Sequence, residues 1–102
     1  MPSQPKYVYR PDVLRTLERH GLAPRDTTRP STIRNHLRAL YRYELRRLRA
    51  ASLEGAFPRA VLASRVAEVR ERYALIARPL ARWTTTPLPL DEAARDQAGP
   101  SC

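Results

Sequence analysis

The chain has 102 residues and a formal net charge of +9, because nineteen lysine and arginine residues outnumber ten aspartate and glutamate residues. This length allows one small domain, and the positive charge favours anionic partners such as nucleic acid, acidic proteins or anionic lipid. A single cysteine excludes an intrachain disulfide, and the lack of any apolar run of about 18 residues predicts no transmembrane segment.

The N-terminal part predicts an extended arm followed by one short helix. Residues 1–10 form the expected arm, with Tyr7 and Tyr9 laid along the rest of the fold. Pro11 is typical of the first position of a helix, where its missing N–H is not needed. Gly21 is typical of the left-handed residue just past a helix end, so we expect the short helix to stop there.

The segment 30–54 predicts a long helix around which the other elements are organised. At about 100° per residue, its large apolar residues fall in one stripe. That stripe consists of Ile33, Leu37, Leu40, Tyr41, Leu45 and Leu48. The other side forms a basic face that consists of Arg34, Arg38, Arg42, Arg46 and Arg49. The helix therefore offers one side to its own core and the other to an anionic partner.

The long helix also carries one acidic residue inside its apolar stripe. A buried carboxylate is costly unless it is paired, so we expect Glu44 to pair with Arg47 or with an arginine of the following helix. At the start of the same helix, Thr28 or Ser31 offers the side-chain oxygen that a helix cap requires.

A second helix is expected after Gly55, with Pro58 in its first turn. Its apolar residues recur at steps of three and four, which is typical of a packed helical seam. They are Leu62, Val66, Val69, Tyr73, Ile76 and Leu80. Because the loop between the two helices is short, we predict antiparallel neighbours. The fold class is therefore all-α, a small antiparallel helical hairpin or bundle of two long helices plus the short N-terminal helix.

These elements predict a helical domain over residues 11–80, followed by a tail. Residues 81–102 are expected to be extended to disordered, with Trp83 packed onto the helices as an anchor. Two prolines in the first half of this tail, Pro87 and Pro89, oppose helix formation.

Catalysis is not supported by the residues available. Three scattered glycines exclude a glycine-rich phosphate loop, and two histidines with one cysteine give no metal-ligand spacing. We expect His20 to act as a cation or capping group at a helix end. The sequence therefore predicts a protein that is not an enzyme and has no intrinsic metal or cofactor.

The long helix carries the tetrapeptide Ala-Leu-Tyr-Arg at 39–42, followed by Glu-Leu-Arg at 44–46. Together with Phe57 and the segment Val-Ala-Glu-Val-Arg-Glu-Arg-Tyr at 66–73, this pattern resembles the LYR-motif proteins. The similarity covers residues 31–75.

The resemblance implies a small adaptor of the mitochondrial matrix that binds acyl carrier protein within a larger complex. It implies that Leu40 and Tyr41 line the mouth of an apolar pocket for the acyl-phosphopantetheine of the carrier. It further implies that Arg42 and Arg46 contact the acidic helix of the carrier and that Phe57 closes the pocket. Without this resemblance, the expected compartment is the bacterial cytoplasm.

A second interpretation is an RNA-binding, DNA-binding or ribosome-associated helical protein. The charge, the basic face and exposed aromatic residues such as Tyr43 and Trp83 favour it, because exposed aromatic rings can stack on bases. No helix-turn-helix, zinc-finger, RRM or KH signature is present in the sequence. A third interpretation, a structural subunit inside a larger assembly, is compatible with both.

Overall fold

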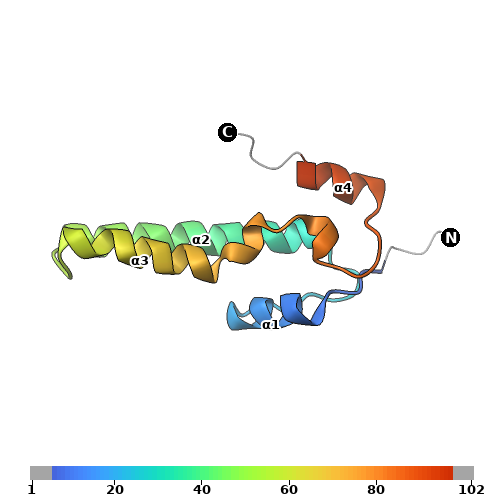
Figure 1. The fold of residues 1–102 in the computed structure, drawn as a ribbon, viewed down its shortest axis with the longest axis horizontal. Coiled ribbons are helices and arrows are strands. Elements are labelled where there is room, and N and C mark those ends of the chain that lie inside the picture. Colours follow the sequence, from blue (N-terminus) through green and yellow to red (C-terminus); the bar gives the residue numbers. More distant parts are fainter. Residues whose placement is uncertain (1–5, 98–102) are drawn as a thin grey trace.

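The computed structural model describes residues 6–97 and shows a helical protein (Figure 1). Its elements are α1 (Pro11–Arg19), α2 (Pro30–Leu53), α3 (Arg59–Arg72), the 3₁₀ turns η1 (Ala74–Ala77) and η2 (Leu80–Arg82), and α4 (Leu90–Gln97). The predicted all-α class is confirmed. Within residues 6–97 the only β-type pairing is an isolated antiparallel bridge between Tyr9 and Thr84.

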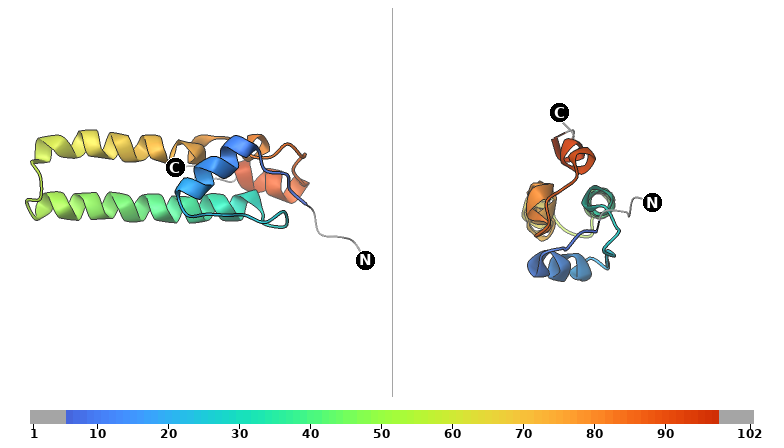
Figure 2. Two further views of the ribbon diagram at one scale, coloured as in Figure 1. Left: turned by 90° about the horizontal axis from the view of Figure 1, so that it is seen from below. Right: turned by 90° about the vertical axis from the view of Figure 1, so that its right-hand side faces the viewer.

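The two longest helices lie side by side and run in opposite directions (Figure 1). At 1.5 Å per residue, α2 alone is about 36 Å long, which explains the elongated molecule of 58 × 28 × 20 Å. Helix α1 lies on one side of the α2–α3 pair and α4 lies on the other (Figure 2). Both cover the same end of the pair, which we call the base, and the distal end projects beyond them.

Glycines end α1 and α2 in the same way. Gly21 has a φ of 76° and Gly55 a φ of 83°, a region that residues with a Cβ rarely adopt. In each case the next residue donates its N–H to a carbonyl five positions earlier, as Leu22 does to Leu17 at 2.9 Å. The predicted stop of the first helix at Gly21 is therefore confirmed.

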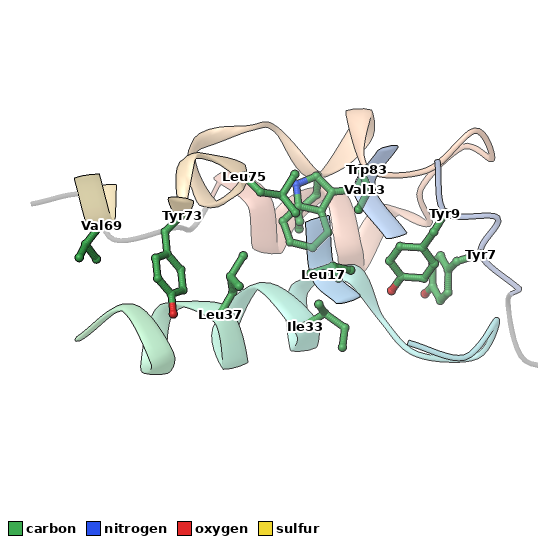
Figure 3. Packing of buried hydrophobic residues seen from close by; sticks show 11 residues of the cluster. Tyr7, Tyr9, Val13, Leu17, Ile33, Leu37, Val69, Tyr73, Leu75 and Trp83 are labelled. Carbon is green, nitrogen blue, oxygen red and sulfur yellow. The ribbon is translucent and has the colours of Figure 1, made fainter. Parts of the chain in front are cut away.

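The hydrophobic core lies at the base, where α1, α2, the 3₁₀ turns and the N-terminal arm meet (Figure 3). Trp83 has no exposed surface, and its indole N–H donates to the Arg78 carbonyl at 3.1 Å. The buried apolar residues are Tyr7, Tyr9, Val13, Leu17, Ile33, Leu37, Val69, Tyr73, Leu75, Leu80 and Trp83. The predicted anchoring role of Trp83 agrees with this position, whereas the expectation of an exposed Trp83 that could stack on bases is wrong.

The described part of the arm, residues 6–10, is extended and buried through its two tyrosines. The Tyr9 hydroxyl donates to the Thr28 carbonyl at 2.6 Å, and burial raises the pKa of that hydroxyl well above its usual range. On the other side of the arm, Thr85 donates its N–H to the Val8 carbonyl at 2.8 Å. The arm therefore joins the loop before α2 to the segment after η2.

Two expectations for the C-terminal half need correction. The second long helix ends at Arg72 instead of continuing to Leu80, because the chain tightens into η1 before Pro79. The expected extended or disordered tail over residues 81–102 instead contains α4, which Pro89 precedes and two acidic residues open. Acidic side chains are favourable in a first turn. Here Asp91 also pairs with Arg29 just before α2, and Glu92 accepts hydrogen bonds from Ser31 of α2. Residues 98–102 lie outside the described part of the chain.

Candidate functional site: the arginine face of α2

The position of α2 in the fold decides which of its side chains remain free. Ile33 and Leu37 are buried in the core, so the side of α2 that is turned away from α3 carries its arginines outward. Four of these, Arg38, Arg42, Arg46 and Arg49, form a row that we call the open arginine face. With a rise of 1.5 Å per residue, the row is about 16 Å long.

Arg34 does not belong to this face, contrary to the prediction. It is only 4% exposed, and its Nη1 lies 2.6 Å from the Asp96 carboxylate of α4. Its Nη2 donates to the Arg95 carbonyl at 3.2 Å. The Arg34 guanidinium is therefore bound by α4, which covers the first turns of α2.

A second acidic residue of α4 holds the start of α2. The carboxylate of Glu92 is completely buried and accepts hydrogen bonds from the Ser31 hydroxyl at 2.6 Å and the Ser31 N–H at 3.1 Å. It thereby satisfies a backbone donor that would otherwise lack a partner at a helix N-terminus. Neither Thr28 nor Ser31 caps the helix as predicted, since the Ser31 hydroxyl donates to Glu92 instead.

The open arginine face contrasts with Arg34. Among residues 6–97, no carboxylate lies within salt-bridge distance of its four guanidiniums. Partial burial, followed by repulsion from Arg34 and Arg42, lowers the pKa of the Arg38 guanidinium. Like charges spaced three or four residues apart on one helix repel one another, and a nearby acidic group would reduce this repulsion.

The other residues predicted for the site are spread over the molecule. Leu40 faces a groove beside α1, and Tyr41 packs on the core with its ring 5.3 Å from that of Tyr73. Phe57 lies in the turn between α2 and α3, under the guanidinium of Arg65 at 4.6 Å. The structure therefore brings Leu40 and Tyr41 together near the base and leaves Phe57 at the distal end.

Glu44 pairs across the helices, as one of the two predicted alternatives stated. Its carboxylate lies 3.6 Å from Nη2 of Arg72 on α3. The same carboxylate, after burial, raises the pKa of the Tyr73 hydroxyl. Glu44 therefore links α2 to α3 through a partly exposed ion pair.

Sequence reasoning missed the two residues that dock α4, Glu92 and Asp96. The available signal was the spacing of four between them, which puts both carboxylates on one side of a helix. The local sequence is rich in small and acidic residues next to prolines, so this signal is weak unless the position of α2 is known.

No group of His, Cys, Asp and Glu side chains in residues 6–97 could hold a metal ion. The helices of that same range are also too short or too polar to cross a membrane. Comparison of the chain with protein-family models, with curated proteins and with solved structures gives no significant match.

Proposed function

We propose that this chain is a non-enzymatic basic adaptor or accessory subunit that docks an acidic helical partner on the open arginine face. The observation that carries the proposal is α4, an acidic helix that already binds α2 through Glu92 and Asp96. The open arginine face continues along α2 from the point where α4 ends. A partner helix would extend a contact that the molecule makes with itself.

The spacing of charges supports a helical partner. On α4, the two carboxylates that reach α2 are four residues apart, and they meet Ser31 and Arg34. Farther along α2, Arg38, Arg42 and Arg46 are also separated by four residues, a rise of about 6 Å. An acidic helix with carboxylates at the same interval would pair with successive guanidiniums, for which arginine offers two parallel hydrogen bonds.

The uncovered distal end of the α2–α3 pair supports a partner with an apolar side as well. Helices α1 and α4 cover only the base, and no other helix of the described chain covers the distal end of the α2–α3 pair (Figures 1 and 2). Leu45 and Leu48 on α2, which pack against the core, and Val66 on α3 remain only partly buried. A partner that covers these residues would stabilise the fold by mass action.

An acyl carrier protein is the partner that we propose, because its acidic helix has the required chemistry and the LYR-like pattern at 39–46 implies it. In this proposal Arg42 and Arg46 contact the carrier, and its acyl-phosphopantetheine reaches the apolar residues near Leu40 and Tyr41. The adaptor would then act in the mitochondrial matrix as part of a larger complex. Phe57 has no part in this proposal, because it lies at the distal end.

The proposal is tested by measuring the affinity for octanoyl acyl carrier protein by calorimetry. Two double variants remove the same charge from different helices: Arg42→Gln with Arg46→Gln on α2, and Arg59→Gln with Arg70→Gln on α3. We expect about tenfold weaker binding for the α2 pair, equivalent to about 1.4 kcal/mol, and less than about twofold for the α3 pair. Equal weakening by both would show a general charge effect and contradict docking on α2.

The nucleic-acid alternative is tested in the same experiment with a single-stranded RNA. Binding to phosphates releases counterions, so affinity falls steeply with salt in proportion to the number of phosphates neutralised. RNA bound more tightly than the carrier, with both double variants equally affected, would favour the alternative.

A further inference from the structure

A second basic site lies on the other side of α2 from the open arginine face. There a groove of about 630 Å³ opens between α1, α2 and the junction of α3 with η1. This volume is in the range of small-molecule sites, which are commonly about 300–1,000 Å³. None of the four residues of the open arginine face lines the groove, and Leu40 is the one residue that it shares with the proposed site of the acyl-phosphopantetheine.

The wall that α1 provides is held in place by His20. Its Nε2 donates to the Arg72 carbonyl at 2.9 Å, since a carbonyl oxygen can only accept. Its ring also lies 4.3 Å from the ring of Tyr73. The end of α1, and with it Arg19, is therefore fixed against the end of α3.

Four arginines line the groove, and they differ in whether they already have an acidic partner. Arg72 is paired with Glu44, and Arg78 lies 2.9 Å from the Asp12 carboxylate. Arg19 on α1 and Arg47 on α2 have no carboxylate within salt-bridge distance among residues 6–97. Two helices thus each supply one guanidinium without an acidic partner to the same groove.

An exposed aromatic ring, that of Tyr43, also lines the groove. Tyr43 is 53% exposed although it is a large apolar side chain, and the guanidinium of Arg47 lies 5.9 Å from its ring centroid. Leu40 and Leu75 supply apolar surface nearby. An exposed ring beside a cation suits a planar ligand that carries negative charge.

We propose that this groove binds a small phosphomonoester with a planar ring, of the size of a mononucleotide. Arg19 and Arg47 contact the phosphate, and Tyr43 stacks on the planar ring. Glu44 and Asp12 already pair with Arg72 and Arg78, so among residues 6–97 the groove's guanidiniums without an acidic partner are those of Arg19 and Arg47. These two charges match the dianion of one phosphomonoester, whereas the additional negative charge of a triphosphate would meet the carboxylates of Glu44 and Glu71.

The site is tested by titrating the full chain with AMP, adenosine and ATP, using NMR to follow the arginine Nε–H resonances and to determine affinity. We expect AMP to bind at least about tenfold more tightly than adenosine and more tightly than ATP, and to shift the resonances of Arg19 and Arg47. Arg19→Gln, Arg47→Gln and Tyr43→Ala should each weaken AMP binding about tenfold. Arg46→Gln, which removes the same charge from a residue of α2 that does not line the groove, should change it less than about twofold.

Adenosine binding as tightly as AMP would overturn the assignment of the phosphate contacts. Equal effects of Arg46→Gln and Arg47→Gln would show that AMP responds only to net charge, which would also overturn the site. Should one variant fail to fold, the comparison of AMP, adenosine and ATP with the wild-type protein still tests whether the groove recognises one phosphate group. Loss of acyl carrier protein binding with AMP binding retained would refute the proposed function alone.

Discussion

The arginines of α2 differ in burial, because their side chains leave the helix at different angles. Arg34 is almost completely buried and bonded to α4, whereas Arg42, eight residues later, is exposed. Eight residues rotate a helix by about 80° beyond two full turns, enough to move a side chain from the covered side to the open one. Charge at Arg34 is therefore used within the fold, and charge at Arg42 remains exposed.

The buried pair of Arg34 with Asp96 should matter for stability. Asp96→Asn removes the negative charge and leaves a guanidinium that is 5% exposed without its counter-ion. We expect the free energy of unfolding to fall by about 2–4 kcal/mol, measured by urea denaturation.

Asp91→Asn is the matched control for this substitution. Asp91 belongs to the same helix and pairs with Arg29 at 3.9 Å, but both side chains of that pair are about half exposed. The control should change stability by less than about 0.5 kcal/mol. Equal effects of Asp91→Asn and Asp96→Asn would show that the Arg34 pair is solvated and contributes little.

The carboxyl of Asp12 should report directly on Arg78. The hydrogen bond from that guanidinium, 2.9 Å long, lowers the pKa of Asp12 below its ordinary value of 3.8. Arg78→Gln should raise the pKa toward that value in an NMR titration of the carboxyl carbon, and Arg82→Gln should leave it unchanged.

The sign of the pH effect follows from the lowered pKa. Such a carboxyl stabilises the fold above its unfolded pKa, and the contribution is lost as pH falls through the folded pKa. Arg78→Gln should therefore lose less stability than wild type when the solution is acidified below about pH 4. An unchanged Asp12 pKa in Arg78→Gln would contradict the contact.

At the scale of whole elements, α4 acts as the cap of α2 although 61 residues separate Ser31 from Glu92. Glu92→Ala should lower the free energy of unfolding by about 2–3 kcal/mol, because the Ser31 N–H and hydroxyl both lose their buried acceptor. Amide hydrogen exchange should accelerate in the first turn of α2 and remain unchanged near Gly55.

Glu92→Gln serves as the control for the cap, since it keeps one acceptor oxygen and nearly the same volume. It should cost less than Glu92→Ala. A cost below about 0.5 kcal/mol for Glu92→Ala, or uniform acceleration of exchange along α2, would contradict capping by α4.

Elements with a local signal were predictable from the sequence. The periodic apolar residues identified α2 and most of α3, and Gly21 identified the end of α1 because a left-handed residue is required there. Helix α4 was missed, since its stability depends on Ser31 and Arg34 across a large sequence separation. The early end of α3 at Arg72 was missed because a 3₁₀ turn preserves a similar apolar spacing.

The candidate site was predictable where it depends on α2 alone, and was not predictable where it depends on other elements. A helical angle correctly separates exposed residues such as Arg42 and Arg46 from the apolar stripe. It cannot show that α4 covers Arg34, or that Phe57 lies at the far end of the α2–α3 pair. The groove at Arg19 and Arg47 was not anticipated, because it forms only where α1 and α2 are brought together.

The molecule as a whole has its core at one end and its free charge along the middle of α2. Helices α1 and α4 cover the base on both sides, while the distal end of the α2–α3 pair projects from it (Figure 2). At the tip, Leu53 is 90% exposed. This arrangement leaves a long uncovered surface beside the open arginine face.

The most direct test of this account is an NMR titration of the arginine Nε–H resonances with octanoyl acyl carrier protein. We expect the resonances of Arg42 and Arg46 to shift progressively to saturation, and those of Arg59 and Arg70 to remain in place. Arg34 should be little affected, because Asp96 already occupies it. Shifts spread evenly over all exposed arginines, or no shift at Arg42 and Arg46, would contradict the account.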